Sequence, residues 1–148
     1  QDYAVVTFDA DGQFEASEIP KLVEPLKSGA ADVVLGSRFI GKALNIPRTK
    51  KFLLRAAVFL TSLLTGLKLT DTHNGFRALS RKAATEMRIS LDRMAHASEI
   101  LDLVKTKRLK YVERPVTISY SAETLQKGQS TVKAMLTAKD IIKKKIVG

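Results

Sequence analysis

The chain has 148 residues, of which 45% are hydrophobic, which is enough for one domain with a buried core. It contains no cysteine, which excludes disulfide cross-links and thiolate metal sites. Its formal net charge of +10 favours an anionic partner: a nucleotide, a lipid phosphate, a membrane surface or a nucleic acid. The charge is uneven, because residues 1–37 contain seven acids and two bases, whereas residues 38–55 contain six bases and no acid.

An apolar, β-branched run at residues 5–8 predicts a buried parallel strand, because both of its faces are apolar. Three polar side chains follow at its carboxyl end, where open α/β sheets place their ligands: Asp9, Asp11 and Gln13. They are hard ligands suited to Mg²⁺ or Mn²⁺, with phosphate oxygens completing the shell. An Asx-type turn that closes the strand explains the same residues equally well.

A helix is expected over residues 18–27, with Ser17 as its N-cap, followed by a second buried strand at 32–38. This strand–helix–strand order predicts a right-handed crossover and a parallel pair of strands. Arg38 should therefore emerge at the sheet edge that carries the first acidic residues. There it can hold a phosphate or pair with those acids; a surface arginine that starts a loop is the alternative.

A loop at 41–47 precedes a long helical pattern over residues 48–66. Four polar side chains share one stripe of this helix: Arg48, Lys51, Arg55 and Ser62. The remaining positions are almost all apolar, but the uninterrupted apolar run is shorter than the roughly 20 residues that span a bilayer. The helix can lie in the membrane interface with its bases toward the headgroups, or it can be a core helix with a basic edge.

A polar turn with glycine, around residues 69–75, precedes a short strand and a helix over about 81–87. Asp71 in this turn is placed to act as an acceptor-side carboxylate or as a general base. His73 alone is more typical of a loop hydrogen bond than of a ligand.

A further helix is expected over about 97–106, with Glu99 in its first turn. There Glu99 either stabilises the helix dipole or acts as a site carboxylate. Residues 111–120 alternate in their second half and predict a strand, in which Pro115 marks an edge or a bulge.

A basic loop with a glycine, at residues 127–130, precedes a helix expected over about 131–146. Lys127 and the amides at this helix start suit an anion. A plain linker with Ser130 as the N-cap accounts for the same residues.

The order of these motifs carries more information than each alone. Asp-Ala-Asp-Gly-Gln, Gly-Ser-Arg, a basic amphipathic helix, Asp-Thr-His-Asn-Gly-Phe-Arg and Lys-Gly-Gln-Ser follow one another along the chain. This order closely resembles family 2 glycosyltransferases, in particular the polyprenyl-phosphate, dolichyl-phosphate mannose synthase-like branch. The resemblance implies an α/β fold: a partial GT-A, Rossmann-like sheet of the nucleotide-diphospho-sugar transferases, with flanking helices.

The resemblance also implies roles for individual residues. A divalent metal on the sugar nucleotide would be bound by Asp9, Asp11 and Gln13. The acceptor lipid phosphate would face Arg38, Arg48 and Arg55. The sugar would lie beside Asp71 and Arg77, and the phosphates would be covered by the loop with Lys127 and Ser130.

The activity implied is metal-dependent, inverting transfer of a sugar from a nucleotide-diphosphate sugar to a polyprenyl phosphate. The protein would be cytoplasmic and peripheral on the inner face of the membrane. A transferase acting on a saccharide hydroxyl in cell-surface polysaccharide synthesis is the alternative, and it would need a base such as Asp71 or Glu99. A nucleic-acid-binding domain is disfavoured, because only 6% of residues are aromatic and no motif of that kind is present.

The chain opens directly on the strand that precedes the Asp-Ala-Asp motif. We therefore expect residues 1–148 to form a single incomplete GT-A domain that lacks the family's N-terminal nucleotide-binding half. The strand at 3–8 would then be a bare edge that pairs with the absent part or with a second copy. Such a fragment would bind nucleotide sugar weakly and could be inactive in isolation.

Overall fold

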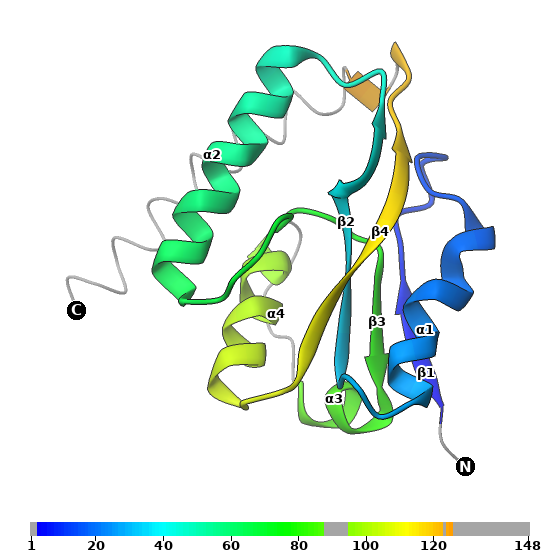
Figure 1. Ribbon diagram of the computed structural model, residues 1–148, viewed down its shortest axis with the longest axis vertical. Coiled ribbons are helices and arrows are strands. Elements are labelled where there is room, and N and C mark those ends of the chain that lie inside the picture. Colours follow the sequence, from blue (N-terminus) through cyan, green and yellow to red (C-terminus); the bar gives the residue numbers. More distant parts are fainter. Residues whose placement is uncertain (1–2, 88–94, 123, 126–148) are drawn as a thin grey trace.

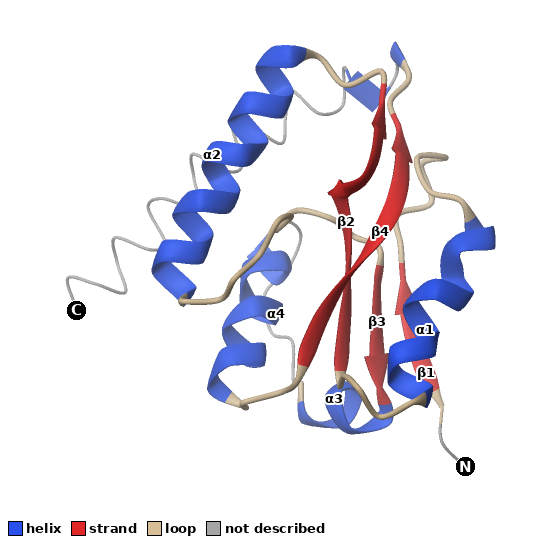
Figure 2. Ribbon diagram, in the orientation of Figure 1, coloured by secondary structure: helices blue, strands red, loops and turns tan. Residues whose placement is uncertain are grey.

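The computed structural model describes residues 3–87, 95–122 and 124–125, and these form a mixed α/β structure (Figures 1 and 2). A four-stranded sheet in the order β1-β3-β2-β4 has helices on both of its faces. The strands are β1 (Ala4–Thr7), β2 (Val33–Leu44), β3 (Arg77–Ser80) and β4 (Tyr111–Ser119). The helices are the 3-10 turn η1 (Ala16–Glu18), α1 (Ile19–Lys27), α2 (Arg48–Thr65), α3 (Arg81–Glu86) and α4 (Ala95–Thr106). This architecture is the predicted one and is consistent with a partial GT-A domain.

The strand order differs from the prediction in one respect. β3 is antiparallel to both β1 and β2, so it lies between them and the predicted β1–β2 pair is wrong. β1 and β2 nevertheless point in the same direction, with Thr7, Arg77 and Leu35 in one row across the sheet. Asp9 follows β1 and Arg38 lies on β2 beyond the same row, so both lie toward the same edge of the sheet, as expected.

β1 is also less buried than its apolar sequence suggests. It is the outer strand of the sheet in the described residues, and only its two central valines are partly buried. Tyr3 and Phe8, which flank it, are about half exposed. An outer strand has one neighbour in its sheet and correspondingly less cover, which is why the periodicity alone overstated its burial.

β2 continues to Leu44 and so includes the first part of the segment predicted as a loop at 41–47. Its parallel pairing with β4 shifts register between Ser37 and Lys42, so β2 bulges there against β4. Gly41 makes this possible, because a Cβ atom at this position would lie 2.2 Å from the carbonyl oxygen of Val116. Pro115 lies on β4 at this irregularity, as predicted, and β4 is an outer strand of the described sheet.

Two apolar cores cover the two faces of the sheet. Val33 and Leu35 of β2 point into one core with residues of α3 and α4. Val34, between them, points into the other core, where Leu22 of α1 and Phe76 are fully buried. The alternation of a strand that is buried on both faces thus fixes which helix covers which face.

Two helix starts differ from the prediction. α1 has Glu18 rather than Ser17 as its N-cap, because the chain first makes a 3-10 turn, and neither side chain caps the helix. α4 begins at Ala95, so Glu99 lies beyond its first turn. A simple interaction of Glu99 with the helix N-terminus is therefore no longer supported, because the dipole effect decays within one turn.

α2 lies alongside the sheet at the upper left of Figure 1 and has little cover. Only Leu54 and Val58 of its residues are buried. Its exposed large apolar side chains are Phe52, Leu53, Phe59, Leu60, Leu63 and Leu64. The structure thus disfavours a core helix at this position. No helix among the described residues has the length and apolar character needed to cross a membrane.

Candidate functional site

A buried ion pair joins β2 to the loop that leads into β3. Asp71 Oδ2 accepts hydrogen bonds from Arg38 Nε at 2.6 Å and from the Arg38 backbone N–H at 3.0 Å. The exposed fractions of the two side chains are only 6% and 1%. The predicted partners of Arg38 were Asp9 and Asp11. Arg38 pairs with Asp71 instead, because the loop after α2 folds back across this edge of the sheet.

The remaining donors of Arg38 bind two further segments. Nη1 donates to the hydroxyl of Tyr120, directly after β4, and Nη2 donates to the carbonyl oxygen of His73 at 2.7 Å. Burial acts to lower the pKa of Arg38, but the charge of Asp71 and the contact with Tyr120 outweigh it and the pKa is raised. Arg38 is therefore a permanent cation at the junction of β2, β4 and the loop at 71–73.

Arg77 is a second buried cation beside this pair. Its side chain is largely inaccessible, and burial lowers its pKa, whereas the charges of Asp9 and Asp71 act to raise it. The loop before β3 approaches Asp9 closely, because a Cβ atom at Gly75 would lie 2.6 Å from Asp9 Oδ2. The structure thus brings Asp9, Arg77, Asp71 and Arg38 together at one edge of the sheet.

The segment after Asp9 forms a turn that continues toward β4. Asp11 Oδ1 accepts a hydrogen bond from the backbone N–H of Gln13 at 3.1 Å, which is the Asx-type turn considered above. Gly12 adopts the left-handed backbone (φ 77°) in this turn. The carbonyl oxygen of Gln13 then accepts a hydrogen bond from Ser119 N, so the turn is anchored to β4.

A divalent metal at this turn would need ligands from elsewhere. In the parts of the chain that the structure describes, no group of three or more His, Cys, Asp or Glu side chains converges as a metal site. Asp9 and Asp11 are both exposed, and Asp11 uses only Oδ1 in the turn. Two accessible carboxylates fit a cation that takes its remaining oxygens from a bound diphosphate and water.

α2 brings further bases toward the buried pair. Lys50 Nζ lies 4.7 Å from the centre of the Tyr120 ring, and partial burial, with the nearby charge of Arg38, lowers the pKa of Lys50. Arg48, in the same turn of α2, is exposed. Arg55 stacks on Phe39, with its guanidinium carbon 5.5 Å from the ring centre.

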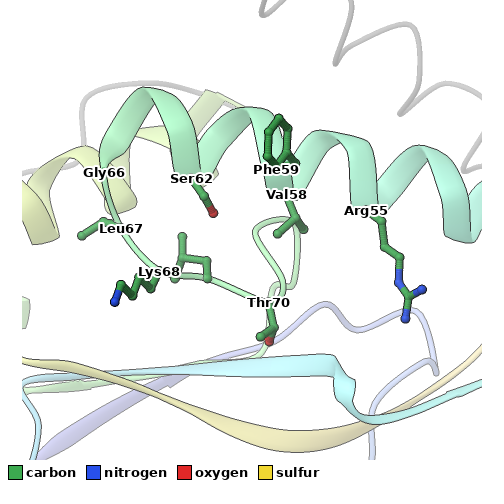
Figure 3. A pocket seen from close by; sticks show the side chains of 9 residues that line it. Arg55, Val58, Phe59, Ser62, Gly66, Leu67, Lys68 and Thr70 are labelled. Atoms are coloured by element: carbon green, nitrogen blue, oxygen red, sulfur yellow. The ribbon is translucent and has the colours of Figure 1, made fainter.

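A shallow groove of about 510 Å³ runs between α2 and the segment at 66–70 (Figure 3). Figure 3 shows Arg55 near one end of the groove and Lys68 near the other, with apolar side chains such as Val58 between them. The Ser62 hydroxyl turns inward, and in the described structure it is buried without a hydrogen-bond partner. The predicted polar stripe of α2 thus borders this groove at Arg55 and Ser62.

The other predicted residues take no part in the contacts described above. Glu99 is partly buried on α4, a helix whose apolar side chains share one core with those of α3. Lys127 and Ser130 lie outside the described residues, as does the helix predicted over 131–146.

Three contributors escaped sequence reasoning: Tyr120, Lys50 and Glu113, whose carboxylate accepts the backbone N–H of Asp71 at 3.1 Å. Tyr120 and Glu113 stand in or beside a strand and belong to no motif, and only the register of β4 against β2 places them near Arg38 and Asp71. Lys50 lies next to the predicted basic stripe, where the helical periodicity gave no reason to single it out.

Comparisons with known protein families and proteins identify relatives of this chain. The family model described as "Glycosyl transferase family 2" matches residues 1–88. An uncharacterised protein of Methanocaldococcus jannaschii is 31% identical over 96% of this chain and 60% of its own length. The UDP-N-acetylglucosamine–dolichyl-phosphate N-acetylglucosaminyltransferase of Methanococcus voltae is 32% identical over 86% of this chain and 52% of its own length. The undecaprenyl-phosphate mannosyltransferase of Micrococcus luteus is 33% identical over 76% of this chain and 48% of its own length.

The mixed α/β fold and the family match define the class of this chain, that of the family 2 glycosyl transferases. The chain belongs to glycosyl transferase family 2, and the resemblance drawn from its motifs is confirmed. It spans about half to 60% of the length of these relatives.

Proposed function

We propose that this chain provides the metal- and acceptor-binding side of an inverting glycosyltransferase. The donor is a nucleotide-diphosphate sugar and the acceptor is a polyprenyl phosphate. The observation that carries the proposal is the meeting of Asp9, Arg77, Asp71 and Arg38 at one sheet edge. The names of two relatives, which specify dolichyl-phosphate and undecaprenyl-phosphate acceptors, support the choice of acceptor.

In the proposed reaction, an oxygen of the acceptor phosphate forms a bond to the anomeric carbon of the sugar. The bond from that carbon to the diphosphate oxygen breaks on the opposite face, and its electron pair leaves with the nucleoside diphosphate. Mg²⁺ or Mn²⁺ held by Asp9 and Asp11, with Gln13 beside them, would offset the charge of the departing diphosphate. Arg77 supplies positive charge at the same edge, and Lys50 supplies it near Arg38. Arg48, in the same turn of α2 as Lys50, would add to this charge.

A lipid phosphate is already ionised at neutral pH, so this reaction needs no general base. That agrees with the structure, in which Oδ2 of Asp71 accepts two hydrogen bonds from Arg38 and the side chain is almost fully buried. A saccharide hydroxyl would require a base with access to it. The burial of Asp71 therefore favours the lipid phosphate over the hydroxyl acceptor.

The test is an assay of the full-length gene product with uridine and guanosine diphosphate sugars, a polyprenyl phosphate and Mn²⁺ or Mg²⁺. We expect a polyprenyl-phosphate sugar of inverted anomeric configuration, no product with EDTA, and loss of most activity in Asp11→Ala. Transfer only to saccharide hydroxyls would refute the acceptor, and full activity of Asp11→Ala would refute the metal role.

The proposal extends to α2, which we place in the headgroup region on the inner, cytoplasmic face of a membrane. Its aromatic positions 52 and 59 share one exposed face with Leu63, because their spacings follow the helical repeat. The basic stripe borders this face and would meet anionic headgroups, while the apolar side chains enter the acyl boundary. This arrangement would bring the lipid phosphate to the start of α2, next to Tyr120.

Vesicle flotation tests this placement. The full-length protein should bind vesicles of phosphatidylglycerol more strongly than vesicles of phosphatidylcholine, and high salt should weaken that binding. Changing Arg48, Lys51 and Arg55 to Glu should abolish the preference. The matched control changes three exposed bases outside α2 to Glu: Lys27, Lys107 and Lys110. Equal loss in both triple variants would show that net charge, rather than α2, determines binding.

A further inference from the structure

The loop that carries Asp71 is held from one side by two side chains of β4. Tyr111 and Glu113 are two residues apart on this strand, so they point to the same face of the sheet. The hydroxyl of Tyr111 accepts a hydrogen bond from Lys68 N at 3.0 Å and donates one to Lys68 O at 3.3 Å. It thus satisfies both backbone groups of a residue that belongs to no strand.

Glu113 acts one step further along the same loop. Its carboxylate accepts the backbone N–H of Thr70 at 2.9 and 3.0 Å, and Oε1 also accepts the N–H of Asp71 at 3.1 Å. No ion pair of Glu113 with a base is found among the described residues. The carboxylate of Glu113 therefore binds two backbone N–H groups. Hydrogen bonds to an ionised acceptor are stronger than those between two neutral groups.

Asp71 is consequently fixed at both of its ends. Glu113 holds its backbone nitrogen, and Arg38 holds its carboxylate through two hydrogen bonds. The neighbouring Thr70 is held a second time, since its hydroxyl lies 2.6 Å from the hydroxyl of Ser37 on β2. The sheet thus sets the loop from β2 and from β4 before any ligand binds.

We propose that Glu113 is a positioning residue for Asp71, acting through the amides of Thr70 and Asp71 without touching the reacting atoms. Its catalytic consequence rests on the function proposed above. Loss of Glu113 should release the loop, turn Asp71 relative to Arg38 and displace the carboxylate beside Arg77. Because Asp71 pairs with Arg38 and its charge acts on Arg77, this movement would be passed on to the cations of the site, and a misplacement of the order of 1 Å can cost about a hundredfold in rate.

Glu18 provides a control, because from η1 its carboxylate binds the same strand. It accepts the backbone N–H of Thr117 on β4 at 2.7 Å and also pairs with Lys21 at 3.2 Å; it is buried, whereas Glu113 is partly buried. Glu18 makes no contact with the loop at 68–71 in the described structure. Glu18→Gln therefore tests the loss of a similar carboxylate–amide bond without the link to Asp71.

The experiment combines amide hydrogen exchange with steady-state kinetics on the full-length gene product. In Glu113→Gln, we expect faster exchange at the amides of Thr70 and Asp71 and a kcat about ten- to a hundredfold lower, with a smaller change in KM for the sugar nucleotide. Glu18→Gln should lower thermal stability and leave both amides and kcat near the wild-type values. Glu113→Ala, which removes both oxygens, should exceed Glu113→Gln in each effect.

Unchanged exchange at Thr70 and Asp71 in both Glu113 variants would overturn the proposal, and so would faster exchange with an unchanged kcat. An equal fall of kcat in Glu18→Gln would reduce Glu113 to a general stabilising role. If the wild-type protein transfers no sugar to any acceptor, the proposed function fails. The exchange experiment would still decide in that case whether Glu113 holds the loop.

Discussion

Two sets of carboxylates lie at the same edge of the sheet, and the structure treats them in opposite ways. Asp71 is buried, and its oxygen is paired with Arg38 at 2.6 Å. Asp9 and Asp11 are exposed, and neither forms an ion pair with a base among the described residues. The first carboxylate has its counter-charge from the protein, whereas the other two are accessible to a charge that arrives with a ligand.

The contrast follows from the cost of removing charges from water. A carboxylate buried in the protein is tolerated only with a charged partner and further hydrogen bonds, which Arg38 provides. Exposed carboxylates remain hydrated and need no such partner. The buried pair therefore belongs to the frame of the site, and the exposed pair belongs to the surface that ligands meet.

The largest effect should come from breaking the buried pair. Asp71→Asn keeps the shape of the side chain but leaves the Arg38 guanidinium buried without its counter-charge. We expect a loss of about 3–5 kcal/mol in the free energy of unfolding, measured by urea denaturation. Asp11→Asn, an exposed counterpart whose side-chain oxygen can still accept from Gln13 N, should change this free energy by less than about 0.5 kcal/mol. Similar losses in the two variants would remove the distinction between frame and surface.

A smaller effect is expected where Arg38 meets β4. Tyr120→Phe removes the hydroxyl that accepts from Nη1 and leaves the ring under Lys50 in place. The expected loss is about 1 kcal/mol, the usual net value of one hydrogen bond, or somewhat more because the donor is charged. Tyr3→Phe, which changes an exposed tyrosine just before β1, is the control and should be neutral.

The smallest effect concerns pH. Burial lowers the pKa of His73; the charge of Asp71 opposes this shift, and those of Arg38 and Arg77 add to it. In the unfolded chain His73 therefore takes up a proton below about pH 6.5, whereas in the folded chain it does so only at a lower pH. The contribution is fully present above this value and is lost as pH falls toward the folded pKa.

Thermal unfolding of the wild type and of His73→Gln checks this sign. Between about pH 7.5 and pH 5.5, the wild type should lose more stability than the variant, by less than about 1 kcal/mol. An identical pH dependence would show that His73 is as easily protonated in the folded chain as in the unfolded one.

The sequence predicted the elements well where local chemistry determines them. The helix predicted over 48–66 is observed at Arg48–Thr65, and it ends at Gly66 in the left-handed conformation. The stop after α1 is similarly marked by Gly29. The second buried strand, predicted at 32–38, is observed as the first half of β2, where every residue from Val33 to Arg38 is buried.

The pairing of segments that lie far apart in the sequence could not be predicted from hydrophobic periodicity. Nothing local indicates that β3 inserts between β1 and β2, or that the acid facing Arg38 lies 33 residues away in sequence. Ser17 fails as a cap for a related reason, since the chain enters α1 through a 3-10 turn and Glu18 reaches across to Thr117. The sequence therefore supplied the candidate residues, whose roles stay predictions, but the partner of each residue required the fold.

The most direct test of the distinction between frame and surface uses Mn²⁺ as a paramagnetic probe. Mn²⁺ and a nucleoside diphosphate are added to the ¹⁵N-labelled full-length gene product, and the broadening of backbone amide signals is measured. The account predicts that broadening is strongest at residues 9–13, weaker around Asp71, and lost in the Asp9→Asn, Asp11→Asn double variant, whose fold stays intact. Broadening that is unchanged in the double variant, or that centres on Asp71 rather than on Asp9 and Asp11, would contradict it.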